Sequence, residues 1–155
     1  MRVERLTAWR VTPLAPGQRM DRCADQTARW HRGRAPMIYA SSTPELAVLE
    51  ALVHFQVPLL PHALLRLTLH DVHVREVRAL PAGWKSRKAL TRDLGDDWLA
   101  RGHGQVLAVP SALCAEAVNL LIASERLVTD QMHCRRMRAF RFDSRLLEGK
   151  GRPAS

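Results

Sequence analysis

The stretch ARWHRGRAPMIYASSTPELAVLEALVH, residues 28–54, sets the pattern from which the fold can be predicted. Its centre, Met37–Ser41 (MIYAS), is a short apolar run that follows a glycine and a proline, which favours a buried strand. A helix is expected directly afterwards. Either Ser42 begins a capping box with the glutamate three residues later, or Thr43 caps a helix whose first residue is proline. We expect this helix to extend to about Gln56.

The apolar residues of the expected helix recur at helical spacing, at Leu46, Leu49, Val53 and Val57. Glu50 falls inside this stripe. A carboxylate on the core-facing side of a helix must be paired, hydrogen-bonded or turned toward a cavity to offset its desolvation. Two interpretations therefore stay open: Glu50 faces a cleft, or it lies at the edge of the stripe and pairs with an arginine.

Outside this stretch the chain favours short strands over helices. Strands are expected over residues 5–11, 64–69, 72–77, 105–109, 118–122 and 137–142, with a second short helix over 91–100. Residues 12–29 are expected to form a long loop, and residues 149–155 a flexible tail after a single domain over residues 1–148. This order of elements predicts an α+β domain built on small mixed sheets.

Composition limits the class of protein further. The 155 residues, 46% of them hydrophobic, suffice for one domain with its own core. Lys and Arg number 24 against 15 Asp and Glu, a net charge of +9 that favours anionic partners. The three cysteines form no C-x-x-C pair, which fits a reducing compartment. The charged N-terminus and the interrupted apolar stretches predict a soluble, cytoplasmic protein without a membrane helix.

Three further residues are candidates for a site. Arg29 lies beside Trp30 at the end of the long loop, where a guanidinium could reach a phosphate. Tyr39 is the only tyrosine, and its ring could stack on a flat heterocycle. Ser111 follows an apolar strand, where strand ends often line sites. Taken singly, a structural role is favoured for Arg29 with Trp30 and for Ser111, which would cap the next segment, while the Tyr39 hydroxyl needs a hydrogen-bond partner if it is buried.

The ordered set of sequence blocks resembles the RES-domain family of bacterial toxins, named for its arginine, glutamate and serine. The matching blocks are WR (9–10), the Arg-Trp, Tyr-Ala-Ser and Leu-Glu core of residues 28–54, LGDDWL (94–99), VLAVPSA (106–112), VNLLI (118–122) and FRFDSRL (140–146). The resemblance implies a fold related to ADP-ribosylating toxins. Such a fold has a split mixed β-sheet core with flanking helices and holds NAD.

The resemblance also implies cleavage of the nicotinamide–ribose bond of NAD, with water, phosphate or a protein side chain as the acceptor. Glu50 would stabilise the positive charge that develops on the ribose. Arg29 would bind the pyrophosphate or ribose side, and Tyr39 would stack on nicotinamide. Ser41 and Ser111 complete the expected NAD-binding set, the latter by orienting Glu50 or the nicotinamide ribose. The implied partner is an Xre-like helix-turn-helix antitoxin that occludes the active site of a homodimeric toxin.

A second class of function stays open: a non-catalytic basic protein of the same fold that binds nucleic acid or an acidic protein. Its charge would come from Arg135, Arg136, Arg138, Arg141 and Arg145. A solvated face or an acidic partner is favoured over nucleic acid, because no recognised nucleic-acid module accompanies these arginines. No metal site is expected, since His70 and His73 would point to opposite faces of one strand.

Overall fold

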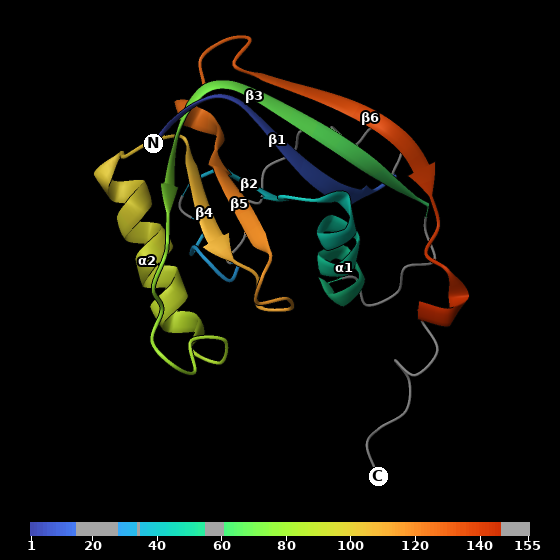
Figure 1. Cartoon of the computed structure of the whole chain (residues 1–155), viewed down its shortest axis with the longest axis horizontal. Helices are drawn as coiled ribbons and strands as arrows, with labels where there is room; N and C mark the ends of the chain where they lie inside the picture. The colour runs from blue at the N-terminus through green and yellow to red at the C-terminus, as the bar shows by residue number, and fades with distance from the viewer. Residues whose placement is uncertain (15–27, 34, 55–60, 147–155) are drawn as a thin grey trace.

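The computed structural model describes residues 1–14, 28–33, 35–54 and 61–146, which form a mixed sheet with two α-helices (Figure 1). The strands are β1 (Arg2–Pro13), β2 (Met37–Ser41), β3 (His62–Glu76), β4 (Val106–Pro110), β5 (Val118–Ala123) and β6 (Met132–Phe140). The helices are α1 (Pro44–His54) and α2 (Lys88–Arg101), and two short 3-10 helices follow later in the chain at Ser124–Arg126 and Ser144–Leu146. The predicted α+β class is confirmed, while the expected tail lies outside the described residues.

The strand order is β1-β2-β5-β4-β3-β6, and β1 pairs with β3 as well as with β2. The β3–β4 pair is parallel, whereas the other described pairs are antiparallel. The β1–β3 ladder is long, and β1 meets β2 only at Trp9 and Ser41. The sheet is therefore strongly curved, with α1 and α2 lying apart from each other (Figure 1).

Helix α1 begins as the second of the two expected caps requires. The backbone N–H of Leu46 donates to Thr43 Oγ1 at 3.2 Å, and Pro44 is the first helical residue. Proline is well suited to this position because its missing N–H has no intrahelical acceptor there. The start of α1 is thus fixed by local chemistry directly after β2.

The predicted apolar stripe of α1 was wrong. Leu46 is buried, but Leu49 and Val53 are 39% and 53% exposed, and Val57 lies outside the described residues. Instead, α1 buries two alanines, Ala47 and Ala51, in a cluster with residues of β1 and β3. Val48 and Leu52 pack against the same cluster, so the side of α1 that faces the sheet differs from the predicted stripe.

The two strands expected over 64–69 and 72–77 are one continuous strand, β3. Asp71 has φ 50°, a left-handed conformation that aspartate tolerates better than most residues. The chain continues past it instead of turning back, because β3 pairs with β1 both before and after Asp71 and with β4 after it.

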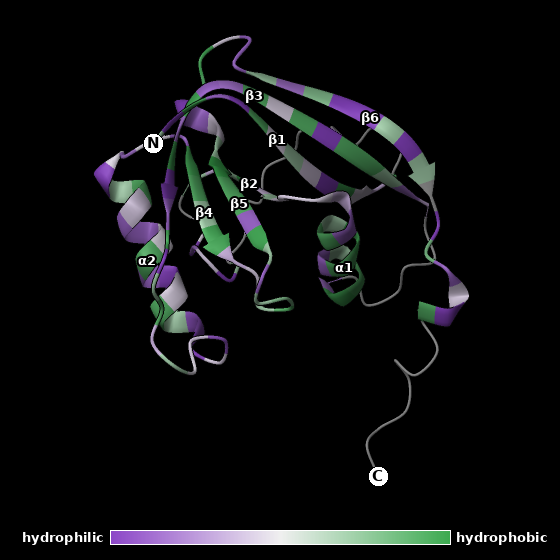
Figure 2. Ribbon diagram, viewed as in Figure 1, coloured by the Kyte–Doolittle hydropathy of each residue, from purple (hydrophilic) through white to green (hydrophobic). Residues whose placement is uncertain are grey.

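Strand β6 begins at Met132 rather than at 137, and it ends at Phe140 rather than 142. Its early start follows from pairing with β3, in which Met132 lies opposite Leu69. Phe142 is buried in the cluster beneath α1, outside the ladder. In Figure 2, β4 is apolar along its length, whereas β6 at the sheet edge carries hydrophilic segments.

Candidate active site

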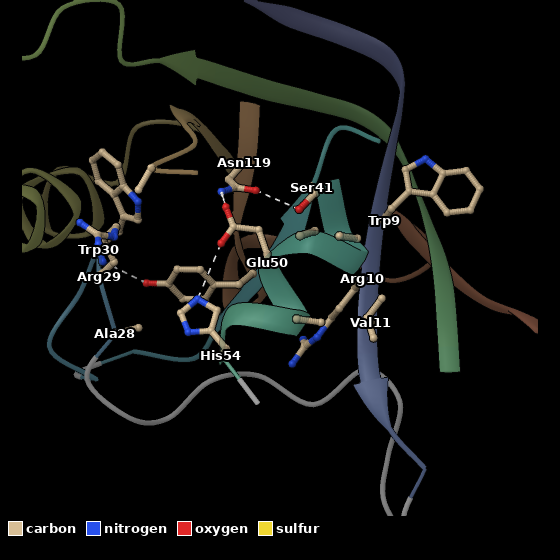
Figure 3. A pocket seen from close by; sticks show the side chains of 15 residues that line it. Trp9, Arg10, Val11, Ala28, Arg29, Trp30, Ser41, Glu50, His54 and Asn119 are labelled. Carbon is tan, nitrogen blue, oxygen red and sulfur yellow. Dashed lines mark hydrogen bonds and ion pairs between the residues drawn. The ribbon is translucent and has the colours of Figure 1, made fainter. Parts of the chain in front are cut away.

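A pocket of about 500 Å³ lies between residues 28–30, β1, β2 and α1, with Ala112 and Asn119 contributing from the β4–β5 side (Figure 3). This volume lies within the ordinary range for small-molecule sites. Four of the five predicted site residues line it: Arg29, Tyr39, Ser41 and Glu50. The fifth, Ser111, is fully buried and lies directly behind the glutamate.

Glu50 carries the carboxylate of this pocket. Its Oε1 accepts hydrogen bonds from Ser111 Oγ at 2.9 Å and from Asn119 Nδ2 at 2.5 Å. Its Oε2 lies 3.7 Å from Nε2 of His54, one helical turn further along α1 (Figure 3). The side chain is only 21% exposed. Glu50 therefore faces a cavity while its desolvation is offset by hydrogen bonds, as the first of the two interpretations requires.

Ser111 makes contacts of both kinds that the sequence suggested: it caps the next segment and it binds Glu50. Its Oγ accepts the backbone N–H groups of Leu113 at 3.1 Å and Cys114 at 3.4 Å, which caps the turn after β4. The same oxygen donates its proton to Glu50. Because Ser111 is fully buried, it acts on the pocket through the carboxylate that it holds.

Ser41 and Asn119 face each other across β2 and β5, where they are directly paired in register. Ser41 Oγ donates to Asn119 Oδ1 at 2.9 Å (Figure 3). Sequence reasoning missed Asn119. The available signal was a single polar residue in the apolar run VNLLI, because a buried amide needs hydrogen-bond partners.

Arg29 is held against the segment before α2. Its NH1 donates to the carbonyl of Lys85 at 2.8 Å, and its own carbonyl accepts from Thr91 Oγ1 at 2.7 Å. The preceding carbonyl, of Ala28, accepts from Arg92 Nε at 2.8 Å. Helix α2 thus fixes the backbone at the pocket wall from which the Arg29 guanidinium extends.

A second set of contacts fastens the same loop to α2. Arg32 donates to Asp96 Oδ2 and Asp93 Oδ1, each at 2.6 Å, and these hydrogen bonds raise the pKa of its guanidinium. Gly95 lies between these two aspartates and packs directly beneath Trp30, where a Cβ atom would overlap the Trp30 carbonyl oxygen. Gly95 and Asp96 of the block LGDDWL, with Asp93 directly before it, therefore support this side of the pocket.

Tyr39 reaches from β2 toward the same loop. Its hydroxyl accepts the N–H of Trp30 at 3.3 Å and lies 2.8 Å from Nδ1 of His31. Burial raises the pKa of the Tyr39 phenol, so the group is protonated at neutral pH. The hydroxyl thus ties the loop to the sheet, while the rest of the side chain contributes to the pocket lining.

Several lining residues were not singled out from the sequence as site residues, and three of them carry an aromatic or basic side chain. Trp9 and Arg10 come from β1, and His54 comes from the last turn of α1. Arg10 and Arg29 both line the pocket, and arginine side chains suit a phosphate-bearing ligand. In the part of the chain that the structure describes, no group of three or more His, Cys, Asp or Glu residues gathers to hold a metal ion. None of the helices described is long and apolar enough to cross a membrane.

Fold and site together define a class: an α+β domain that holds a hydrogen-bonded glutamate in an arginine-lined pocket. The family model of the RES domain matches residues 7–145, and the chain belongs to this family. Toxin Res of Pseudomonas putida is 36% identical over 102 residues, which cover 61% of this chain and 69% of that protein.

Two other similarities extend over more of the chain. The Prs ADP-ribosylating toxin of Sphingobium sp. is 28% identical over 128 residues, 77% of this chain and 80% of its own length. A chain in the crystal structure of the M. tuberculosis MbcT-MbcA toxin-antitoxin complex matches with a TM-score of 0.73. That match covers 97% of this chain and 92% of the other at 15% identity, so it establishes the shared fold.

Proposed function

We propose that this chain is the toxin of a toxin–antitoxin pair and that it cleaves the nicotinamide–ribose bond of NAD. The observation that carries the proposal is Glu50, whose carboxylate is held on the wall of an arginine-lined pocket by Ser111 and Asn119. Membership of the RES domain family and the names of the relatives, Toxin Res and Prs ADP-ribosylating toxin, support it.

The proposed chemistry follows from how charge moves as the bond breaks. The electron pair of the C–N bond leaves with nicotinamide, and positive charge develops on the ribose ring. A carboxylate fixed beside the ribose stabilises this charge more than it stabilises bound NAD, which lowers the barrier. Carboxylates take this role widely in glycosyl transfer. Because both hydrogen-bond donors bind Oε1 of Glu50, we assign Oε2 to the ribose.

The other lining residues suit the remaining parts of NAD. The guanidinium groups of Arg29 and Arg10 match the geometry and charge of the pyrophosphate. The Tyr39 ring offers an apolar face for nicotinamide, and Trp30 packs beside it in the same wall. Incubation of the purified protein with NAD, with nicotinamide measured by chromatography, tests the proposal directly. Parallel reactions with and without phosphate, and with a cell extract as a source of protein acceptors, identify where the ADP-ribose goes.

Arg29→Lys is expected to weaken NAD binding more than it slows the chemical step. Lysine supplies the charge and can still donate to the Lys85 carbonyl, but it lacks the planar fork that binds phosphate through two hydrogen bonds. We expect KM to rise roughly tenfold, the equivalent of about 1.4 kcal/mol, with kcat nearly unchanged. Steady-state kinetics and melting temperature are measured on the same variant. A large loss of stability with unchanged KM would make Arg29 structural, and a pure loss of kcat would place it in the transition state.

The proposed partner is an antitoxin that covers the pocket mouth in the cytoplasm. We assign it to the Xre-like helix-turn-helix class and expect the toxin to form a homodimer within the complex. An acidic or carboxylate-bearing segment would complement Arg10 and Arg29 in the pocket. Neither direct binding of nucleic acid nor membrane attachment by the toxin is part of this proposal.

Expression of the chain alone is expected to arrest bacterial growth, because unrestrained loss of NAD or modification of a host protein stops metabolism. Co-expression with the product of the neighbouring gene should restore growth. Growth curves and cellular NAD content are followed after induction, with the inactive Glu50→Gln variant as the matched control. Normal growth of cells that contain folded, active protein and no partner would contradict the assignment as a toxin.

A further inference from the structure

We infer that Asn119 and Ser41 are positioning residues that hold Glu50 in one orientation through hydrogen bonds whose directions are all fixed. The catalytic consequence rests on the proposed function, whereas the network itself can be tested by protein stability alone. Figure 3 shows the chain of contacts that runs from Ser41 through Asn119 to Glu50. On this view, Ser41 serves the site through Asn119 and makes no contact with NAD.

The direction of the Ser111–Glu50 bond is set by the backbone. A hydroxyl has one proton and two acceptor lone pairs. The oxygen of Ser111 already accepts two N–H groups, from Leu113 and Cys114. Its proton is therefore left for Oε1 of Glu50, which lies 2.9 Å away.

The direction of the Asn119–Glu50 bond is set by the carboxylate, which can only accept. The side-chain amide of Asn119 has an acceptor end and a donor end. Nδ2 therefore faces Oε1 of Glu50 at 2.5 Å, and Oδ1 is left to accept from Ser41 Oγ at 2.9 Å. A flipped amide would set Oδ1 against the carboxylate, acceptor against acceptor. Ser41 thus anchors the acceptor end of Asn119 while the donor end holds the glutamate.

The fold supplies the precision that such a network needs. Ser41 and Asn119 are opposite each other in the β2–β5 ladder, and the N–H of Ser42 continues the pairing by donating to the Val118 carbonyl at 3.0 Å. Ser41 is almost fully buried. Two donors from different elements converge on Oε1, so the Glu50 side chain is held while Oε2 is directed to the His54 side of the pocket.

A stability cycle tests the network without reference to activity. Asn119→Asp sets a second acceptor-only carboxylate against Glu50, and we expect a clear fall in melting temperature at neutral pH. Glu50→Gln alone should change the melting temperature little, because glutamine keeps an acceptor for both donors. Combined with Asn119→Asp, it removes the like-charge contact and adds an N–H donor, so the double variant should melt well above the Asn119→Asp single variant. Equal melting temperatures for these two variants would overturn the inference.

A kinetic experiment separates positioning by Ser41 from direct contact with NAD. Ser41→Ala removes the hydrogen bond that anchors Asn119 Oδ1, so the amide and the Glu50 carboxylate that it holds are placed less precisely. A misplaced reacting group can cost up to about 100-fold in rate. We expect kcat to fall with KM nearly unchanged, and Ser41→Thr, which keeps the hydroxyl, to recover much of the rate. A rise in KM with unchanged kcat would instead place Ser41 against the substrate and overturn its positioning role. If the wild-type protein releases no nicotinamide, the proposed function fails, and the stability cycle alone decides whether the network exists.

Discussion

Glu50→Gln is expected to abolish the release of nicotinamide from NAD while leaving the protein folded. Glutamine has nearly the same shape and keeps an oxygen that can accept from Ser111 and Asn119. It lacks the negative charge that would stabilise the positive ribose in the transition state. Removal of one electrostatic contact of this kind costs about 100- to 1,000-fold in kcat, so we expect a loss of at least that size. Chromatography of the nicotinamide released over time measures it.

The matched control is Glu45→Gln, which removes a charge from an exposed position in the first turn of the same helix. It should retain wild-type turnover, and both variants should melt within a few degrees of the wild-type protein. Wild-type turnover by Glu50→Gln would show that another group stabilises the cation. Glu50 would then be a buried structural carboxylate held by Ser111.

The local parts of this fold were predictable because local chemistry determines them. The apolar run before Ser42 is β2 with the expected bounds, and Thr43 with Pro44 starts α1 where capping rules place a helix start. The face that α1 buries was not predictable from hydrophobic spacing. Ala47 and Ala51 are less apolar than Leu49, yet they are buried in a cluster with residues of β1 and β3 while Leu49 is 39% exposed. Contacts with residues distant in the chain decide which side of this helix is buried.

Long-range pairing explains the other differences from the expected fold. Nothing in the sequence around Asp71 shows that β3 continues past it, because the strands that pair with it there, β1 and β4, come from distant parts of the chain. The same limit applies to the site. The role of Asn119 follows from the pairing of β5 with β2, which places its side-chain amide between Ser41 and Glu50. This pairing cannot be read from the sequence around Asn119.

The block LGDDWL was identified only through the resemblance to the family, which gives no physical reason for its residues. The family pattern includes it, but neither hydrophobic period nor charge explains a glycine in the middle of a short helix. The structure gives the reason. Asp96 in the block and Asp93 directly before it bind Arg32, and Gly95 between them leaves space for the backbone of Trp30. The pocket wall that carries Arg29 depends on this contact between α2 and the loop.

Gly95→Ala is therefore expected to destabilise the protein and to weaken NAD binding, against the usual effect of this substitution. Alanine within an exposed helix is favoured over glycine by about 1 kcal/mol. Here the added Cβ would overlap the carbonyl oxygen of Trp30, so the loop must move away from α2. Overpacking of this kind costs about 1–3 kcal/mol, and each kcal/mol lowers the melting temperature of a domain this size by roughly 2–4 °C. Because Arg29 adjoins Trp30, KM for NAD should rise in the same variant.

Thermal melting and steady-state kinetics on Gly95→Ala check both parts of this prediction. Lys88→Ala, at the exposed start of the same helix, is the control and should change stability by less than about 0.5 kcal/mol. Whether the melting temperature of Gly95→Ala falls or rises decides the first part of the prediction. A Gly95→Ala protein that melts higher than the wild type, as helix propensity alone would have it, would show that α2 does not press against Trp30. A Gly95→Ala protein that melts lower but keeps its KM for NAD would show that the contact between Gly95 and Trp30 does not position Arg29. The hydrogen bond from Arg29 to the Lys85 carbonyl would then hold it in place.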